Sequence, residues 1–254
     1  MFKLSVYIVT LNEEKRLEKT LKAAHQVADE IFVIDSGSTD QTQQIAEENG
    51  AVFIFHKWKN ISAQKHFGET LCHNDWVLSL DADEVLSPAL IQEIKEKLSN
   101  PIADAYKMHI RDMLPGDKKP RFLAKSYNQV RLYRRSKSTM PDNLTNDRVI
   151  TGEDAVIEQL KNDVYHYSYI SLTQTWFKLN MYTDELVKTA LEKGKKYTRL
   201  RLYTELPRQF FIYYFVKRYC LYGICGFWMA VTYAYFRFLK IAKWFEYQAL
   251  HLKK

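Results

Sequence analysis

Strand-like and helix-like patterns of apolar residues alternate through the first hundred positions of the chain. Short runs rich in β-branched and aromatic residues predict four strands, and apolar residues recur at helical spacing between them. The predicted strands are Leu4–Thr10, Ile31–Asp35, Ala51–Phe55 and Trp76–Leu80. The predicted helices are Glu13–Val27, Asp40–Asn49, Ser62–Cys72 and Pro88–Leu98. Short apolar strands separated by helices favour an α/β fold with a mostly parallel sheet flanked by helices.

The pattern changes after about residue 100. Further strands are predicted at Ala105–Arg111, Gln129–Arg134 and Val164–Tyr169. Residues 136–154 contain little hydrophobic periodicity and several Asp, Asn and Thr residues, which is typical of a mobile loop at a site. An amphipathic helix is predicted at Ser171–Gly194. We therefore expect a first domain over residues 1–170 and a helical extension over residues 171–254.

The C-terminal extension carries the basic surplus of the chain. The 254 residues include 37 Lys and Arg against 30 Asp and Glu, a formal charge of +7. Eight basic residues and one acid, Glu246, fall after residue 206, so the preceding part balances to zero. Aromatic residues, 14% of the whole chain, accompany these charges. Basic residues beside bulky rings favour an anionic membrane surface, and no nucleic acid, as the partner of this extension.

An uncharged run of 18 residues lies between Arg218 and Arg237. This length is the lower limit for a transmembrane helix, and the glycines, tyrosines and threonine of the run dilute its hydrophobicity. A helix or hairpin that lies in the membrane interface, or packs on the protein, therefore fits better than a span. A buried core helix is the remaining alternative.

The cysteines and the N-terminal residues indicate the compartment. The three cysteines, Cys72, Cys220 and Cys225, form no CxxC pair, so neither a disulfide framework nor a zinc site is predicted. Met1 leads into a predicted strand rather than a signal peptide. We expect a cytoplasmic protein that is peripheral on the inner face of the cytoplasmic membrane.

Polar residues cluster at the ends of three predicted strands. The clusters are Thr10-Leu-Asn12-Glu13, Asp35-Ser-Gly-Ser-Thr-Asp40 and Asp81-Ala-Asp83-Glu84. Ligands bind beyond the carboxyl ends of the strands in parallel α/β sheets, so we expect all three clusters at one edge. Taken singly, Asn12-Glu13 and Asp35 can also start or cap the following helices.

Asp81 and Asp83 are the strongest candidates for chemistry. Carboxylates two residues apart on an extended segment point the same way. Crowded oxygen ligands suit Mg²⁺ or Mn²⁺, particularly when the ion also holds a diphosphate. Because the acids follow a buried strand directly, they would repel one another without a cation. The sequence therefore predicts a divalent metal site at this position.

These motifs, with Gln64-Lys65, resemble the family 2 inverting glycosyltransferases of the GT-A fold. A narrower resemblance is to the bacterial lipopolysaccharide core glucosyltransferases that add β-linked glucose to an inner-core heptose. It is carried by Trp58, Gln64-Lys65, Arg131-Leu-Tyr-Arg-Arg135, His166-Tyr-Ser-Tyr169 and the Gly-Phe-Trp-Met-Ala segment of the tail.

The resemblance implies roles for individual residues. The nucleotide-binding residues it implies are Thr10, Asn12, Glu13, Asp35, Lys65, Asp81, Arg131 and Arg134. The metal ligands it implies are Asp83, Asp81 and His166. The alternative for Lys65 is a solvated lysine on a helix. The alternative for Arg131 and Arg134 is that they are arginines at alternating positions of a strand without a binding role. His166 is otherwise a hydrogen-bonded structural histidine.

Inversion at the anomeric carbon requires one carboxylate that deprotonates the acceptor hydroxyl. In relatives this base follows the Arg-rich strand, often in a Val-His-Glu sequence. The matching stretch here reads Thr145-Asn146-Asp147, without the histidine. Asp147 is the first candidate, followed by Glu153 and Asp154, and each is otherwise a loop acid. The Gln-x-x-Arg-Trp motif of processive synthases is missing, so we expect a single transfer.

The expected function is the transfer of one hexose, glucose in the first place, from a UDP-sugar to a lipid-linked saccharide such as the lipopolysaccharide or lipooligosaccharide inner core. The expected cofactor is Mg²⁺ or Mn²⁺. One alternative is a glycosyltransferase that acts on a polyprenyl phosphate. The other is a non-catalytic GT-A scaffold at the membrane periphery.

Overall fold

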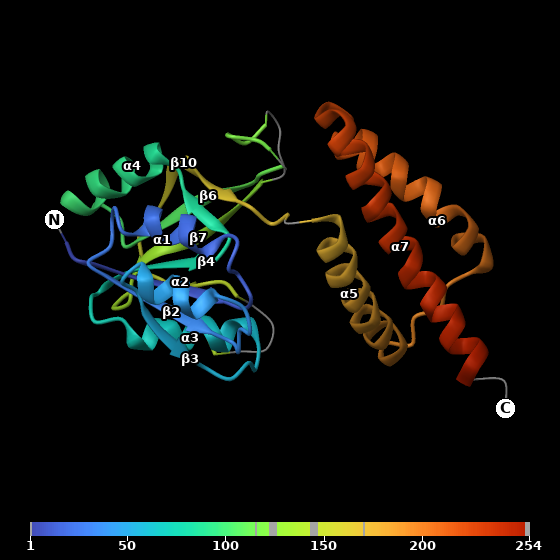
Figure 1. The fold of residues 1–254 in the computed structure, drawn as a ribbon, viewed down its shortest axis with the longest axis horizontal. Helices are drawn as coiled ribbons and strands as arrows, with labels where there is room; N and C mark the ends of the chain where they lie inside the picture. The colour runs from blue at the N-terminus through green and yellow to red at the C-terminus, as the bar shows by residue number, and fades with distance from the viewer. Residues whose placement is uncertain (1, 115, 122–125, 143–146, 170, 252–254) are drawn as a thin grey trace. The chain divides into compact units, whose positions relative to one another are not determined.

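The computed structural model describes residues 2–114, 116–121, 126–142, 147–169 and 171–251. The chain forms two compact units (Figure 1). The first comprises residues 1–113 and 118–168, and the second comprises residues 114–117 and 169–254. The main division therefore falls between Ser168 and Tyr169, two residues before the boundary expected from the sequence.

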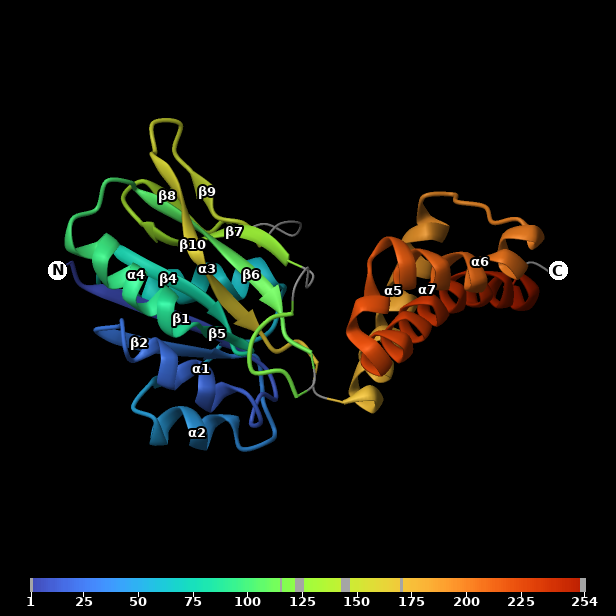
Figure 2. The ribbon, with the colours of Figure 1, turned by 90° about the horizontal axis from the view of Figure 1, so that it is seen from above.

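An eight-stranded sheet forms the centre of the first unit, in the order β3-β2-β1-β4-β7-β6-β10-β5 (Figure 2). Its strands are β1 (Leu4–Thr10), β2 (Glu30–Asp35), β3 (Val52–Phe55), β4 (Trp76–Asp81), β5 (Glu84–Leu86), β6 (Ala105–Asp112), β7 (Ser126–Arg134) and β10 (Ile157–His166). β3, β2, β1 and β4 are parallel. β7 is antiparallel to β4 and β6, β10 is parallel to β6, and β5 is antiparallel to β10. The predicted α/β class is confirmed, and apart from β5 the strands of the mixed half follow residue 100, where the sequence pattern changes.

Helices cover both faces of the parallel half. They are α1 (Leu17–Ala24), α2 (Thr42–Glu48), α3 (Ile61–Leu71) and α4 (Pro88–Ser99). Leu4, Val6 and Ile8 of β1 lie in one apolar core with residues of α1, α2 and α4. Tyr7 and Val9 lie in a second core with residues of α3. Successive strand side chains point to opposite faces, so this burial on both sides is what the continuous apolar run of β1 predicts.

The sequence predicted the mixed half less accurately. β10 begins at Ile157, seven residues before the predicted start, and ends at His166. Along β10 only Leu160 and Val164 are buried, so its apolar pattern is weak and its pairing with β6 determines the strand. β5 was not predicted, because three residues are too few to display a period.

Residues 136–154 are not a loop throughout. They include two short paired strands, β8 (Ser138–Thr139) and β9 (Ile150–Thr151). Residues 143–146 lie outside the described part of the chain.

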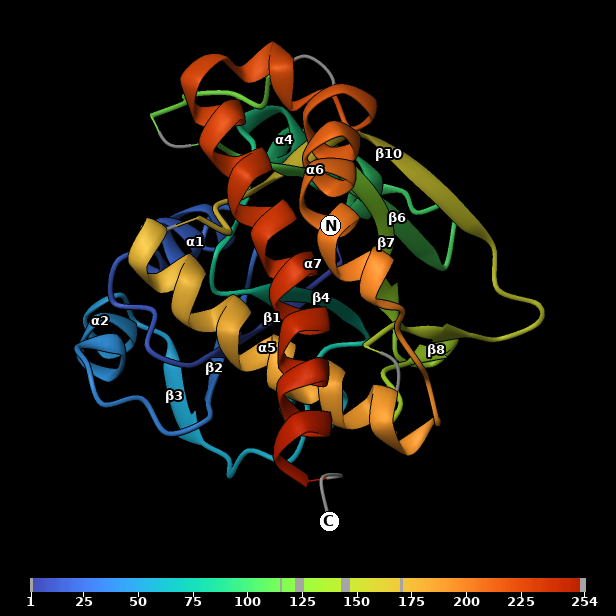
Figure 3. The same cartoon turned by 90° about the vertical axis from the view of Figure 1, so that its right-hand side faces the viewer.

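Three helices make up most of the second unit: α5 (Leu172–Glu192), α6 (Arg199–Phe211) and α7 (Gly223–His251). α7 packs between α5 and α6 (Figure 3). Ser171 caps α5, as the predicted helix at this position requires, and Thr198 caps α6. A π-helical turn (Ile212–Val216) and a 3-10 turn (Tyr219–Tyr222) connect α6 to α7. Over the described ranges, no helix has the length and apolar character to cross a membrane.

Candidate active site

The carboxyl ends of β1, β2 and β4 meet at one edge of the sheet. Thr10 is the register partner of Asp35, and Val9 is the register partner of Asp81. The three polar clusters therefore share this edge, as expected from the sequence. Thr10 and Asp35 are buried, and the Thr10 Oγ1 has no hydrogen-bond partner among the described residues.

Asn12 and Asp35 shape the two loops that leave β1 and β2. Asn12 adopts a left-handed backbone conformation (φ 55°), and its Oδ1 accepts a hydrogen bond from the Thr39 N–H (2.8 Å). The Oδ2 of Asp35 accepts hydrogen bonds from the N–H groups of Gly37 and Ser38 (2.7 and 2.8 Å). Both side chains thus form turns in the structure, and their contact with a nucleotide stays a prediction.

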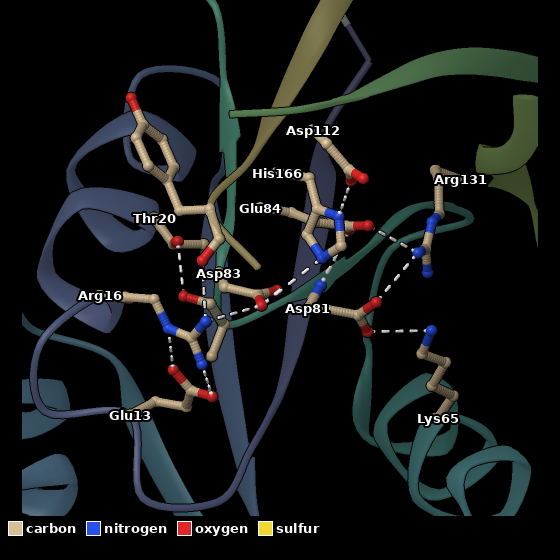
Figure 4. Close-up of polar contacts among 12 residues, drawn as sticks. Glu13, Arg16, Thr20, Lys65, Asp81, Asp83, Glu84, Asp112, Arg131 and His166 are labelled. Atoms are coloured by element: carbon tan, nitrogen blue, oxygen red, sulfur yellow. Dashed lines mark hydrogen bonds and ion pairs between the residues drawn. The ribbon is translucent and has the colours of Figure 1, made fainter. Parts of the chain in front are cut away.

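Two buried cations hold the acids that follow β4 (Figure 4). Lys65 Nζ lies 2.9 Å from Asp81 Oδ1, and its side chain is fully buried rather than solvated. Arg131 Nη2 lies 3.1 Å from Asp81 Oδ2 and 2.8 Å from Glu84 Oε1. Burial alone would raise the pKa of Asp81, but Lys65 and Arg131 outweigh it and hold that pKa well below its usual range. At Glu84 burial dominates and raises the pKa.

A β-bulge directs Arg131 toward this cluster. Tyr106 pairs with Leu132 and Lys107 pairs with Val130, so Arg131 is the additional residue on β7. Bulges next to active sites commonly re-aim a side chain in this way. The Nε and Nη1 of Arg131 have no hydrogen-bond partner within the described ranges. Both nitrogens are buried, because the Arg131 side chain is only 2% exposed, and a contact of Arg131 with a diphosphate stays a prediction.

Arg134 lies elsewhere, which corrects its expected place beside the diphosphate. It is the register partner of Trp76, the first residue of β4, whereas Asp81 is the last. Its guanidinium lies over the Trp76 ring, 5.1 Å from the centroid, and 3.8 Å from a carboxylate oxygen of Asp104. Because β7 is antiparallel to β4, three residues along β7 separate the two arginines toward opposite ends of the strand pair.

Asp83, in the turn between β4 and β5, lies beside His166 at the end of β10, the strand that pairs with β5. The Oδ2 of Asp83 lies 3.5 Å from His166 Nε2, and His166 Nδ1 lies 2.8 Å from Asp112 Oδ1. Burial alone would lower the pKa of His166, but its hydrogen bonds with Asp112 and Asp83 raise this pKa to about 10. His166 therefore carries a proton in this arrangement.

Arg16 is a further cation of the site. Its Nη1 lies 3.1 Å from Asp83 Oδ2 and 2.8 Å from the carbonyl oxygen of Tyr167, and its Nε donates to Glu13 Oε2 (2.6 Å). One turn further along α1, Thr20 Oγ1 donates to the carbonyl of Ala82 (2.8 Å). The start of α1 therefore positions the Asp81–Asp83 segment.

The donor atoms around Asp83 fit a divalent cation. A carboxylate and an imidazole Nε2 are adjacent, and Asp112 holds the other ring nitrogen, which is the arrangement that orients metal-bound histidines. In the part of the chain that the structure describes, no three His, Cys, Asp or Glu side chains form a complete cage. Mg²⁺ commonly takes only one or two protein carboxylates and completes its shell with water and phosphate oxygens. The set therefore suits an ion bound together with a diphosphate.

Of the three candidate bases, Asp147 lies beside the acidic cluster. Its Oδ2 lies 3.3 Å from Lys65 Nζ, and the same nitrogen contacts Asp81. Thr145 and Asn146, which precede it in the matching stretch, lie outside the described residues.

Glu153 and Asp154 are not brought to the cluster. Both are exposed, and Asp154 lies 2.5 Å from the ammonium of Lys137. The backbone N–H of Lys137 bonds the carbonyl of Arg134, which lies toward the opposite end of the strand pair from Asp81. The structure therefore does not place Glu153 or Asp154 beside Asp81.

Sequence reasoning missed Arg16 and Asp112 as residues of this site. Arg16 stands three positions after Glu13 at a helix start, the spacing at which side chains meet on a helix. Asp112 follows the predicted strand Ala105–Arg111, so the strand-end argument applied to Asp35 and Asp81 would have found it. Both signals were present in the sequence.

An α/β unit that gathers acids, a histidine and buried cations at the carboxyl edge of its parallel strands has the architecture of a GT-A glycosyltransferase. The chain belongs to glycosyl transferase family 2, whose sequence profile matches residues 5–151. It is 37% identical over 251 residues to an uncharacterized glycosyltransferase of Rickettsia conorii, covering 95% of this chain and 89% of that protein.

One further relative and one solved structure are also similar to this chain. The lipopolysaccharide core biosynthesis glycosyltransferase LpsC of Rhizobium meliloti is 28% identical over 254 residues, covering 97% of this chain and 93% of that protein. Among solved structures, TarS of S. aureus has a TM-score of 0.47 and 18% identity, covering 73% of this chain and 40% of that chain.

Proposed function

We propose that this glycosyltransferase transfers one hexose, glucose in the first place, from a UDP-sugar to a lipid-linked saccharide with inversion. The observation that carries the proposal is the contact of Asp83 with His166 beside Asp81 and its buried cations. The name of the Rhizobium relative supports the core of lipopolysaccharide as the acceptor.

The donor nucleotide lies over the edge formed by β1, β2 and β4 in this proposal. The loops shaped by Asn12 and Asp35 bind the nucleoside, and the buried Thr10 hydroxyl without a described partner offers a further polar contact. Arg131, which is buried against Asp81 and Glu84, contributes positive charge beside the diphosphate. Lys65 fixes Asp81 and contributes positive charge below the phosphates.

Asp83 and His166 would hold the Mg²⁺ or Mn²⁺, with Asp81 next to them. The ion, when bound, offsets the charge that develops on the leaving diphosphate. For His166 to ligate through Nε2, it must give up its proton, and the hydrogen bond to Asp112 keeps the remaining N–H on Nδ1. Asp83 would then hold the ion through the carboxylate that now contacts the protonated histidine.

Asp147 acts as the general base. Its carboxylate accepts the proton of the acceptor hydroxyl as the oxygen attacks the anomeric carbon from the face opposite the diphosphate. Lys65 holds the carboxylate beside the cluster through the 3.3 Å contact. A single displacement of this kind inverts the configuration at the anomeric carbon.

The second unit brings the enzyme to its acceptor. Its basic and aromatic residues hold the protein on the anionic inner face of the cytoplasmic membrane, where a lipid-linked saccharide is already embedded. No contact with nucleic acid is part of the proposal.

A donor screen tests the function. The purified protein is incubated with several UDP- and GDP-sugars, with and without Mn²⁺ or Mg²⁺, and nucleotide release is measured with lipopolysaccharide core or extracted polyprenyl phosphate as acceptor. We expect metal-dependent UDP release from UDP-glucose with the core acceptor. Asp83→Asn should lower it roughly 100-fold or more, while the matched variant Asp154→Asn retains it. Full activity of Asp83→Asn with Mn²⁺ would refute the metal-centred proposal, and transfer only to polyprenyl phosphate would refute the acceptor.

A further inference from the structure

A short irregular segment joins α6 to α7 (Figure 3). Large apolar side chains of this segment are exposed. We call residues 211–224 the α6–α7 apex. Its exposed apolar residues, with the exposed fraction of each, are Phe211 (57%), Phe215 (51%), Val216 (64%), Leu221 (56%) and Ile224 (81%). Scattered single apolar residues are normal on protein surfaces, but several in one short turn indicate an interaction site.

The outward direction of these side chains is built into the backbone of the apex. In the 3-10 turn, residues three apart share a face, and Tyr219 and Tyr222 are both buried. Leu221 lies between these tyrosines on the outer side of the turn, and Ile224 is exposed in the first turn of α7. A Cβ on Gly226 would lie 1.8 Å from the carbonyl oxygen of Tyr219, so only glycine lets α7 approach the turn this closely. The protein thus buries tyrosines here and exposes Leu and Ile, the reverse of their usual distribution.

Basic residues stand among the exposed apolar ones. Lys217 and Arg218 are both exposed, and Lys217 Nζ also lies over the Tyr213 ring, 4.4 Å from its centroid. No acidic residue occurs in the sequence between Glu205 and Glu246. The apex therefore presents apolar bulk and positive charge together, without a negative charge of its own.

We propose that the α6–α7 apex inserts into the interface of an anionic bilayer. This inference rests on the proposed function, which requires a lipid-linked acceptor. The apolar side chains enter the boundary between headgroups and acyl chains, and Lys217 and Arg218 contact the lipid phosphates. A protein partner with an acidic rim would complement the charge, but a bilayer accommodates apolar residues that point outward from a convex turn without needing a matching groove.

Vesicle binding of the full chain tests the apex. Partition into vesicles of phosphatidylglycerol and phosphatidylcholine is compared with partition into phosphatidylcholine alone. Val216→Ser with Ile224→Ser should reduce binding to the anionic vesicles at least tenfold. Lys217→Gln with Arg218→Asn should reduce it by roughly fivefold per charge, and asparagine tolerates the left-handed backbone at residue 218 (φ 63°).

A matched control uses the other end of α6. Leu200 and Tyr203 are 72% and 76% exposed, so Leu200→Ser with Tyr203→Ser removes a comparable exposed apolar area. We expect this variant to bind vesicles as the wild type does. Equal loss in the control and the apex variants, or no loss in the apex variants, would overturn the proposal.

Cys220 provides a readout that does not depend on a disruptive substitution. Its thiol lies in the 3-10 turn and is partly exposed. In a Cys225→Ser protein, anionic vesicles should slow its reaction with a water-soluble thiol reagent at least fivefold, and an unchanged rate would contradict insertion. UDP release without vesicles should be the same in wild type and apex variants, so a failure of the apex proposal can be distinguished from a failure of the proposed transferase activity.

Discussion

Arg16 Nη1 lies 3.1 Å from Asp83 Oδ2, although the two residues are 67 positions apart in the sequence. The Nε of Arg16 donates a hydrogen bond to Glu13, and the side chains of Arg16 and Asp83 are only 14% and 15% exposed. The first loop of the donor edge is thereby coupled to the candidate metal ligand. Arg16 orients Asp83 in the way that outer partners orient metal ligands.

Replacing Arg16 should weaken metal binding. Arg16→Met leaves Asp83 without its orienting donor, and loss of such a partner commonly lowers metal affinity by roughly 10–100-fold. Calorimetric titration of Mn²⁺ into the protein with UDP present measures the effect. Lys22→Met, on the same helix but at an exposed ion pair, is the control. Tighter Mn²⁺ binding by Arg16→Met would instead identify Arg16 as a competitor of the ion.

The three candidate bases can be separated by kinetics. Asp147→Asn should lower kcat by roughly 10²–10⁴-fold with little change in the KM for the UDP-sugar, because a general base acts on the acceptor and not on donor binding. Glu153→Gln and Asp154→Asn should retain wild-type kcat, since neither residue lies near Asp81. Initial rates with a saturating acceptor decide between them, and a large loss of kcat in Asp154→Asn would contradict this assignment.

The parallel half of the sheet and its polar edge were predictable from the sequence because each depends on local information. A run such as Leu4–Thr10 is apolar at every position, and its termination at polar residues indicates the ligand edge without any knowledge of partners. β10 carries only two buried residues, and its pairing partner β6 lies about fifty residues away in sequence. Such a strand depends on tertiary contacts that the local sequence does not record.

Lys65 and Arg134 illustrate what the sequence leaves undetermined within the site. Lys65 reads equally well as a solvated helix residue, and only the packing of α3 against β1 and β4 buries it beside Asp81. Arg134 shares a strand with Arg131, but the bulge and the antiparallel register direct the two guanidinium groups to different ends. The sequence shows that these residues are positively charged, but the direction of each side chain depends on tertiary packing for Lys65 and on strand register for Arg134.

The buried Lys65 should be important for stability. Lys65→Met removes the cation that Asp81 and Asp147 share, while Arg131 still pairs with Asp81, so we expect a loss of about 1–3 kcal/mol. Urea unfolding at neutral pH measures the change. In Lys65→Met with Asp81→Asn the loss should be smaller than the sum of the single variants, because they remove the same contact. Additive losses would show that Lys65 and Asp81 do not stabilise each other.

Glu205 should make the helical unit sensitive to acid. Its buried carboxylate accepts hydrogen bonds from Arg208 Nη2 (3.0 Å) and Gln209 Nε2 (2.9 Å), and Arg201 Nε lies 3.3 Å away. Burial alone would raise the pKa of Glu205, but these partners lower it below its ordinary value.

The pKa of Glu205 is about 4.3 in the unfolded state and lower in the folded state. Ionised Glu205 therefore stabilises the protein above about pH 4.3, and this stabilisation is lost as the pH falls through the pKa of the folded state. Glu205→Gln should therefore cost about 1–3 kcal/mol at pH 7, and the difference from wild type should shrink at pH 3.5. Urea unfolding followed by circular dichroism at both pH values measures it. Glu185→Gln, at an exposed ion pair on α5, should match the wild type at either pH. A difference between Glu205→Gln and wild type that stays constant across this range would mean that Glu205 stabilises the unit through packing rather than through its charge.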